Sequence, residues 1–256
     1  MEKINIYGTY CLTIREIRRF IRVYHQTIIT PVISSLIFLA VFVLALGAHK
    51  TDIAGIKFIN FVGYGLIIMS IIQNAFTNSA SSFVMSKILG YIGDILTPPL
   101  SGIEIVIAFS LGSIARGILT GTVVAVALSP FIDYNLAHPF LLIYFVFFSC
   151  ALLGQLGILS GIIANSFDQS AALMSYIITP LSFLSGTFYS VKLLPPIFQY
   201  INLFNPIFYM IDGFRYCLTD HADGNITAGF ILLAIGNIIF FLILTKLIDK
   251  GWRIKS

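Results

Sequence analysis

The side chains that most often carry catalysis or hold metals are few in this chain, and their spacing favours neither role. The cysteines are Cys11, Cys150 and Cys217, and the histidines are His25, His49, His138 and His221. They form no C-x-x-C, H-x-x-x-H or H-E-x-x-H pattern, and zinc and disulfide sites depend on such groupings. A G-x-x-x-x-G-K-[ST] phosphate loop is also absent from the sequence, and with it the usual cradle for ATP. We therefore predict no catalytic residue, no metal site and no cofactor bound by this chain.

One charged residue stands inside an apolar run and is a candidate functional residue. Arg116 follows Glu104 by twelve residues, which corresponds to about 18 Å along a helix. An arginine so deep in lipid is costly unless it faces a cavity, a carboxylate or free carbonyl groups. Two interpretations stay open: Arg116 faces a lumen and meets an anionic group such as a lipid headgroup or a saccharide phosphate, or it snorkels or binds backbone carbonyls where a neighbouring helix is broken.

Membrane helices must position these residues, because the chain is 58% hydrophobic and only 10% charged, with a mean hydropathy of +0.95. A soluble domain is about a quarter charged. About 20 helical residues cross a bilayer core of about 30 Å, and six apolar runs reach that length. The predicted spans are 27–48, 56–77, 104–129, 139–163, 170–190 and 228–248. We predict an all-α membrane protein in which residues 1–256 form a single transmembrane domain.

The distribution of basic residues predicts the orientation. If both termini are cytoplasmic, ten of the 15 lysines and arginines fall on the cytoplasmic side, four fall outside and Arg116 lies within a span. This bias follows the positive-inside rule. We therefore expect a multi-pass protein of the cell (inner) membrane with both termini in the cytoplasm. The apolar spans make the lipid bilayer an expected partner. Nucleic acid is not an expected partner, because no basic run in the sequence is interleaved with aromatic residues.

Residues 12–25 are predicted to form a helix that lies in the membrane interface. Its basic face holds Arg15, Arg18, Arg19 and Arg22. Its apolar face holds Ile14, Ile17, Ile21 and Tyr24. Such a pattern turns basic side chains toward anionic headgroups. The alternative is a basic flank that only orients the first span.

Between the second and third spans the spacing predicts a short amphipathic helix. The apolar stripe consists of Val84, Ile88, Tyr91 and Ile95, and Lys87 and Asp94 lie off the stripe. The sequence Thr97-Pro98-Pro99 ends the helix, because proline lacks the backbone donor and clashes with the preceding turn. The helix either serves as a cytoplasmic contact or only joins two spans.

The stretch before the last span is apolar but interrupted by Pro195, Pro196 and Pro206. Each half is too short to cross the bilayer, so we predict a re-entrant pair of half-helices at the outer face, packed in protein. Asn205-Pro206 suits an N-cap followed by a first-turn proline. Asp212 and Arg215 are predicted to form a weak surface pair. The alternative is an interfacial plug without moving parts.

Two groups of motifs follow one another in order. The first group is Lys87, Asp94-Ile95-Leu96-Thr97-Pro98-Pro99-Leu100-Ser101, Glu104, Gly112, Arg116-Gly117 and Gly121. The second group is Leu184-Ser185-Gly186-Thr187-Phe188-Tyr189-Ser190, Leu194-Pro195, Asn205-Pro206 and Arg215. With six spans and a basic amphipathic start, the chain resembles the type 2 ABC permease family, the membrane subunits of ATP-binding-cassette exporters. Phe183 and the extra Pro196 depart slightly from the usual pattern.

The resemblance implies a role for each region. Residues 83–96 would be the coupling helix that docks in the ATPase, with Val84, Lys87, Ile88, Tyr91, Asp94 and Ile95 as its coupling residues. Pro195, Pro206 and Arg215 would belong to an outer gate. The chain would work with a second permease copy and with ATPase subunits that hold ATP and Mg, and would export an amphiphilic or glycan-type substrate. Two competing functions are a self-standing secondary transporter or channel, and an intramembrane enzyme. The first would need carboxylates inside the membrane, and the second would need acidic residues paired with histidines. The predicted spans offer neither arrangement.

Overall fold

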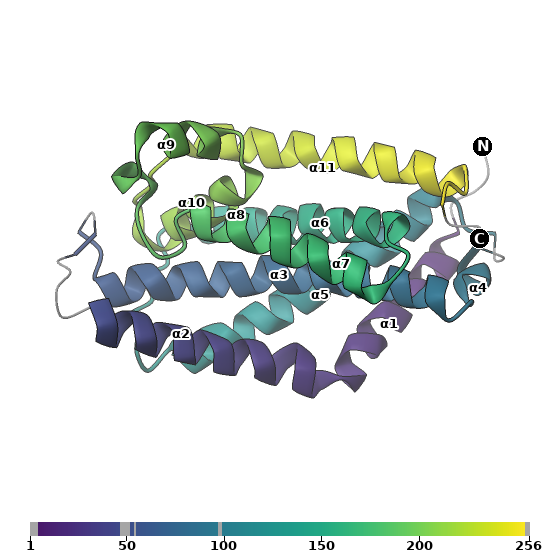
Figure 1. Ribbon diagram of the computed structural model, residues 1–256, viewed down its shortest axis with the longest axis horizontal. Coiled ribbons are helices and arrows are strands. Elements are labelled where there is room, and N and C mark those ends of the chain that lie inside the picture. The colour runs from purple at the N-terminus through teal and green to yellow at the C-terminus, as the bar shows by residue number, and fades with distance from the viewer. Residues whose placement is uncertain (1–4, 47–51, 54, 97–98, 254–256) are drawn as a thin grey trace.

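The computed structural model describes residues 5–46, 52–53, 55–96 and 99–253. Within these ranges every extended regular element is a helix, and a single bridge joins Ile53 to Ile56. Figure 1 shows the long helices side by side. The α-helices are α1 (Ile6–Arg22), α2 (Thr30–Leu46), α3 (Phe58–Ile88), α4 (Ile92–Leu96), α5 (Gly102–Leu128), α6 (Pro139–Ile163), α7 (Phe167–Leu173), α8 (Thr179–Leu184), α9 (Pro196–Leu203), α10 (Pro206–Thr219) and α11 (Ile226–Asp249). Two π-helical turns, η1 (His25–Ile29) and η2 (Met174–Ile178), and one 3-10 turn, η3 (Val191–Leu193), connect them.

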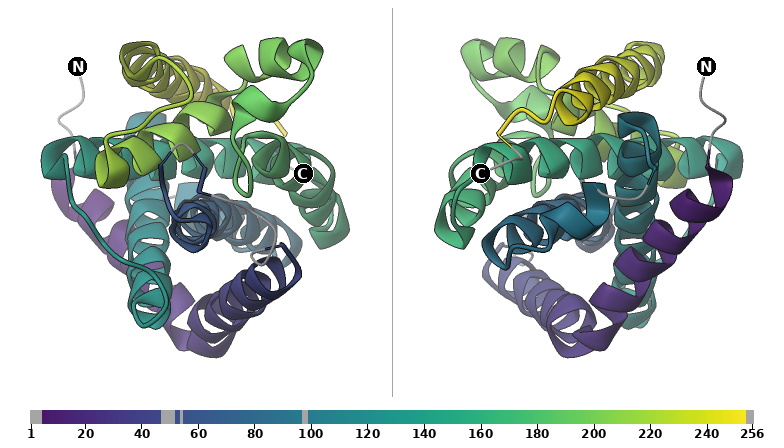
Figure 2. Two further views of the ribbon diagram at one scale, coloured as in Figure 1. Left: turned by 90° about the vertical axis from the view of Figure 1, so that its left-hand side faces the viewer. Right: turned by 90° about the vertical axis from the view of Figure 1, so that its right-hand side faces the viewer.

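Helix α3 is the buried centre of the molecule. The long helices α2, α5 and α6 pack against it, and α11 packs against α5 and α6 (Figure 2). Helix α3 packs most extensively against α6 and α5, and small residues allow the close approach. A Cβ atom added at Gly157 of α6 would clash with the carbonyl oxygen of Phe76, and one added at Gly117 of α5 would lie 2.6 Å from Cys150 Sγ. Gly117 and Gly157 therefore lie where helices of this chain pack closely against one another.

Five helical segments among the described residues are long and apolar enough to cross a membrane. They are His25–Leu44, Phe58–Ile88, Gly102–Leu128, Pro139–Ile163 and Ile226–Asp249. These segments correspond to five of the six predicted spans. The second is longer than predicted, because α3 continues from residue 77 to Ile88 without a break.

The segment predicted as the fifth span, 170–190, differs from the other five. Helix begins at Phe167, widens into the π turn η2 and ends at Leu184, before Gly186 with its φ of +81°. Pro180 lacks the N–H that would continue the regular ladder, which accounts for the wider turn before it. The same Ile-Ile-Thr-Pro sequence occupies residues 28–31, where the π turn η1 again precedes the proline. This helical segment is not among the five candidate spans, so a sixth crossing stays a prediction.

The N-terminal helix is longer than predicted and buries a different face. It begins at Ile6 rather than residue 12, because the side chain of Asn5 accepts a hydrogen bond from the N–H of Gly8 at 2.9 Å and caps it. Its buried residues are Leu12, Glu16 and Phe20. Two members of the predicted apolar face, Ile21 and Tyr24, are about half exposed. The helix lies obliquely across α5 (Figure 2).

The two ends of the bundle carry different elements (Figure 1). Helix α4 lies at the end where both chain termini are found, and α9 and α10 lie toward the opposite end. The basic side chains of α1 and the C-terminal Lys87 of α3 belong to the first end.

Candidate functional site

The segment predicted as one coupling helix is divided by a turn. Val84, Lys87 and Ile88 belong to the last turns of α3, and Gly90, with φ of +79°, reverses the chain before the five-residue α4. The prediction of a separate helix over residues 83–96 is therefore wrong, because its first half continues a buried span. Residues 97–98 of the predicted proline stop lie outside the described residues.

The six predicted coupling residues point in different directions. Val84 and Ile95 are buried, with exposed fractions of 1% and 2%. Ile88 is 46% exposed, Asp94 is exposed and Tyr91 is half-buried. The apolar stripe predicted from the spacing therefore contains two kinds of residue. Some are buried and attach the segment to the bundle, and others face away from the bundle.

Lys87 binds the C-terminus of α6. Its Nζ donates to the carbonyl oxygens of Ile162 and Ala164 at 2.8 Å each, and to that of Gly161 at 3.4 Å. These carbonyls have no partner inside the helix, and a cation there also favours the helix dipole. Lys87 therefore joins α3 to the α6–α7 turn.

The short α4 is held by an apolar cluster at the same end of the bundle. Ile95 packs in a cluster with Leu12 of α1, Phe83 of α3, Ile105 of α5 and Ile248 of α11. Residues from every long helix at this end thus share one core with α4. Displacing α4 would disturb all of them, since a packed core resists local deformation.

A buried polar junction joins α1 to α3, and the sequence analysis missed it. Glu16 is fully buried and accepts hydrogen bonds from Arg15 at 2.8 Å, Arg19 at 3.3 Å and the Ser82 hydroxyl at 2.9 Å. Arg19 also donates to the carbonyl and side-chain oxygens of Asn78, at 2.8 Å each. Two features of the sequence could have indicated this junction. One is a single acidic residue among the arginines of α1. The other is a row of polar residues spaced by four in α3, namely Ser70, Asn74, Asn78, Ser82 and Ser86.

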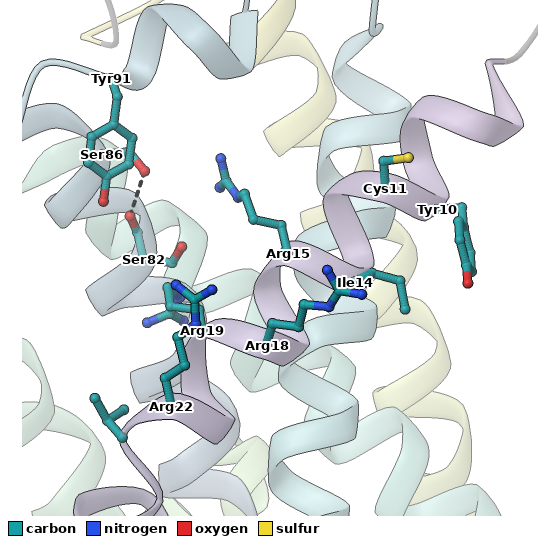
Figure 3. A pocket seen from close by; sticks show the side chains of 11 residues that line it. Tyr10, Cys11, Ile14, Arg15, Arg18, Arg19, Arg22, Ser82, Ser86 and Tyr91 are labelled. Atoms are coloured by element: carbon teal, nitrogen blue, oxygen red, sulfur yellow. Dashed lines mark hydrogen bonds between the residues drawn. The ribbon is translucent and has the colours of Figure 1, made fainter.

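The four arginines of α1 line a groove of about 800 Å³ between α1 and the end of α3. Figure 3 shows Arg15, Arg18 and Arg22 on one side of it and Ser82, Ser86 and Tyr91 on the other. Arg18 and Arg22 are exposed, whereas only 24% of the Arg19 side chain is exposed because of its contacts with α3. The groove can therefore attract an anionic group to the side chains that are not used in packing.

Arg116 is buried, with an exposed fraction of 6%, and binds α3 rather than a broken helix. Its Nη2 donates to Asn74 Oδ1 at 3.1 Å, and its Nε has no hydrogen-bond partner among the described residues. No ion pair joins it to a carboxylate in the part of the chain that the structure describes. The predicted alternative of helix carbonyls is not what the structure shows, since the partner is an amide side chain of the continuous α3.

At the opposite end, α9 and α10 form two short helices as predicted. Pro195 precedes α9, and Pro206 is the first residue of α10, whose N-cap Asn205 accepts a hydrogen bond from the N–H of Ile207 at 3.0 Å. This confirms the predicted cap. Asn205 also donates to the Ser185 hydroxyl at 2.7 Å, which ties α10 to the end of α8.

Arg215 and Asp212 do not form the predicted surface pair. Both are 2% exposed, and each binds a separate partner. Arg215 Nη2 donates to the carbonyl oxygen of Gly186 at 2.8 Å, and its guanidinium lies 3.6 Å from the centre of the Phe61 ring. Asp212 accepts from the backbone N–H groups of residues 223 and 224 at 2.8 and 2.9 Å. Two motif residues quoted separately from the sequence, Gly186 and Arg215, thus meet in the fold.

Comparison with known proteins agrees with this architecture. The family profile described as ABC-2 type transporter matches residues 7–219. The chain is 34% identical over 243 residues to Inner membrane transport permease YadH of Escherichia coli (strain K12), covering 94% of each protein. It is 31% identical over 96 residues to Nodulation protein J of Rhizobium leguminosarum bv. viciae, covering 38% of this chain and 37% of that protein. The chain therefore belongs to the ABC-2 type transporter family and is a membrane transport permease.

Proposed function

We propose that this chain is the membrane-spanning subunit of an ATP-binding-cassette exporter that works with a second permease copy and separate ATPase subunits. ATP and Mg would bind to the ATPase subunits, and this chain would bind neither. The chain would cross the inner membrane six times, with α7, η2 and α8 as the additional crossing. Both termini, α1 and α4 would lie in the cytoplasm.

The packing of the α3–α4 turn against the rest of the bundle carries the proposal. A contact made on the exposed side of this end is joined to a helix of 31 residues, buried along most of its length. Ile95 fixes α4 in the shared apolar cluster, and Lys87 fixes the end of α3 to α6. Force applied by a partner at this point would therefore move packed helices rather than a loose loop.

Exposed residues at the turn would provide the contact surface for the ATPase. Ile88 and Leu89 are 46% and 59% exposed, and Asp94 is exposed beside them. A small apolar patch with a charge at its edge has the composition of an interface core and rim. Val84, Lys87 and Ile95 would act by holding this surface in place.

The substrate would be an amphiphile or glycan-type molecule that carries an anionic group. The exposed Arg18 and Arg22 in the groove of α1 would attract that group, as basic residues at a membrane surface do. Arg116 would meet it deeper in the path, with its unpartnered Nε available as a donor. Movement of α9 and α10 around the Arg215–Gly186 contact would open the outer exit.

The coupling assignment is tested by binding of the ATPase subunit. Ile88→Glu places a charge on the proposed contact surface. Leu193→Glu places the same charge on an apolar residue at the other end that is more exposed, at 70% against 46% for Ile88. We expect Ile88→Glu to reduce co-purification of the ATPase at least about tenfold, the effect of an unpaired interface charge. Leu193→Glu should leave co-purification unchanged. Equal retention of the ATPase by both variants would contradict the assigned contact.

A second measurement separates the proposed function from the alternative of a self-standing transporter. The unmodified chain is reconstituted in vesicles with and without its ATPase, and export of fluorescent amphiphiles is followed after addition of ATP. We expect transport only when both subunits and ATP are present. Transport by the chain alone would refute the ATP-driven mechanism even if the ATPase bound as predicted.

A further inference from the structure

A cavity of about 340 Å³ lies between α5, α6 and α11, and the described residues that line it include neither Arg116 nor any residue of α1. Most of its lining is apolar, and its rim includes the exposed side chains of Phe147 and Leu242. Because these helices are candidate membrane spans, the open side of the cavity faces the bilayer. A molecule dissolved in the bilayer can thus enter it laterally.

Three buried polar side chains line this apolar cavity, one from each helix. Ser110, Gln155 and Asn237 have exposed fractions of 8%, 4% and 7%. Within the ranges that the structure describes, Ser110 Oγ, Gln155 Oε1 and Asn237 Oδ1 have no hydrogen-bond partner. A buried polar atom without a partner is costly, and three around one cavity indicate that a further group completes the site.

The depth of these residues restricts the missing group. Ser110 lies eight residues from the start of α5, about 12 Å, and Asn237 lies eleven residues from the start of α11, about 17 Å. The headgroups of ordinary phospholipids stay outside a hydrocarbon core about 30 Å thick. The donor that reaches these oxygens must therefore be carried within an apolar molecule.

Water alone does not suit the cavity. A water molecule occupies about 30 Å³ in the liquid, so the volume of the cavity corresponds to about ten water molecules. The described lining offers these water molecules three polar atoms without a hydrogen-bond partner. An amphiphile fills the apolar part and donates to the polar part at the same time. We propose that this cavity binds a hydrocarbon-like lipid bearing a hydroxyl group within its apolar portion, such as a hydroxylated acyl chain.

The test uses the full chain in lipid nanodiscs and a photoactivatable stearoyl ester with a hydroxyl midway along its chain. Labelling is competed with the hydroxylated ester and with the same ester lacking the hydroxyl, and labelled peptides are mapped by mass spectrometry. We expect labelling on α5, α6 and α11. We expect the hydroxylated competitor to be about five- to tenfold more effective, the contribution of one net hydrogen bond.

Matched variants assign the preference to the cavity. Gln155→Met keeps the side-chain length and removes the amide, and should reduce the preference for the hydroxylated competitor to less than about twofold. Ser110→Ala should act in the same direction with a smaller change in side-chain volume. Ser149→Ala removes another buried, unpartnered hydroxyl of α6 that does not line the cavity, and should leave the preference unchanged.

The result in the unmodified protein decides the inference even if a variant fails to fold. Equal competition by the two esters would overturn it, because the cavity would then only accept acyl chains or hold water. Labelling confined to other helices, or an unchanged preference in folded Gln155→Met protein, would also overturn it. None of these outcomes depends on ATP or the ATPase, so the proposed transport function can fail while this site stands.

Discussion

Removing the carboxylate of Glu16 should weaken the attachment of α1 to α3. Glu16 is the buried acceptor for Arg15, Arg19 and Ser82, and it is the one carboxylate that the described part of the chain contributes to this junction. The substitution Glu16→Ala leaves the Ser82 hydroxyl without its acceptor and leaves two guanidinium groups with fewer partners. The free energy of unfolding must therefore decrease.

The magnitude follows from the three contacts and from what each partner retains. A hydrogen bond to a charged group contributes about 1.5–3 kcal/mol. Adding this value for all three hydrogen bonds would overstate the decrease in the free energy of unfolding. Arg15 is 40% exposed and returns to water, and Arg19 keeps its two contacts with Asn78. We expect a loss of about 3 kcal/mol, the lower end for breaking a buried pair. At about 2–4 °C per kcal/mol for a chain of this size, Tm falls by about 6–12 °C.

The measurement compares Glu16→Ala with Arg18→Ala in detergent-purified protein. Arg18 lies on the same helix but is exposed, so its removal should change Tm by less than about 1 °C. Hydrogen exchange should accelerate in α1 and not in α11. A double-mutant cycle with Ser82→Ala should give a coupling of about 1 kcal/mol or more. Additive effects, or a Tm equal to that of Arg18→Ala, would refute the buried junction.

Two further predictions concern helix packing and pH. Gly157→Ala should lower the free energy of unfolding by about 2 kcal/mol or more, because the added Cβ meets the backbone of α3. Gly236→Ala should be neutral or slightly stabilising, because the nearest neighbour of its added Cβ is 3.5 Å away. Thermal unfolding of the two variants tests this difference. The hydrogen bond from Lys57 lowers the pKa of Asp133, so its stabilising contact is present above the ordinary aspartate pKa of about 3.9 and is lost as pH falls through the lower folded value. The small Tm difference between unmodified protein and Asp133→Asn should accordingly be present at neutral pH and disappear in acid.

Apolar length and helix caps were readable from the sequence because each depends on neighbouring residues. Five predicted spans and the Asn205 cap correspond to observed elements. The length of α3 was not readable, since the polar side chains that follow residue 77 resemble the end of a span in a one-dimensional hydropathy profile. They are tolerated there because α1 and α5 supply their hydrogen-bond partners, as Arg19 does for Asn78.

The candidate functional residues show the same difference between features that depend on neighbouring residues and features that depend on distant contacts. The spacing of Val84, Ile88, Tyr91 and Ile95 predicted one helical face, but Gly90 interrupts the helix and changes the direction of every later side chain. The partners of Lys87 could not be predicted, because backbone carbonyls at the end of α6 leave no mark in a side-chain pattern. Long-range contacts of this kind depend on how the helices are arranged.

The polar spacing along α3 suggests why one long helix joins the two ends of the proposed path. Residues four apart lie on one face, so Ser82 and Asn78 bind α1 while Asn74 binds Arg116 of α5. A rigid shift of α3 by one helical turn, about 5.4 Å, would move each of these groups to the position of its neighbour in the stripe. The contacts would then break together and re-form with the next polar residue. If α4 receives force from a partner, this repeat offers discrete positions for α3 instead of a gradual loss of contacts, and substituting Asn78 with leucine should remove one of them.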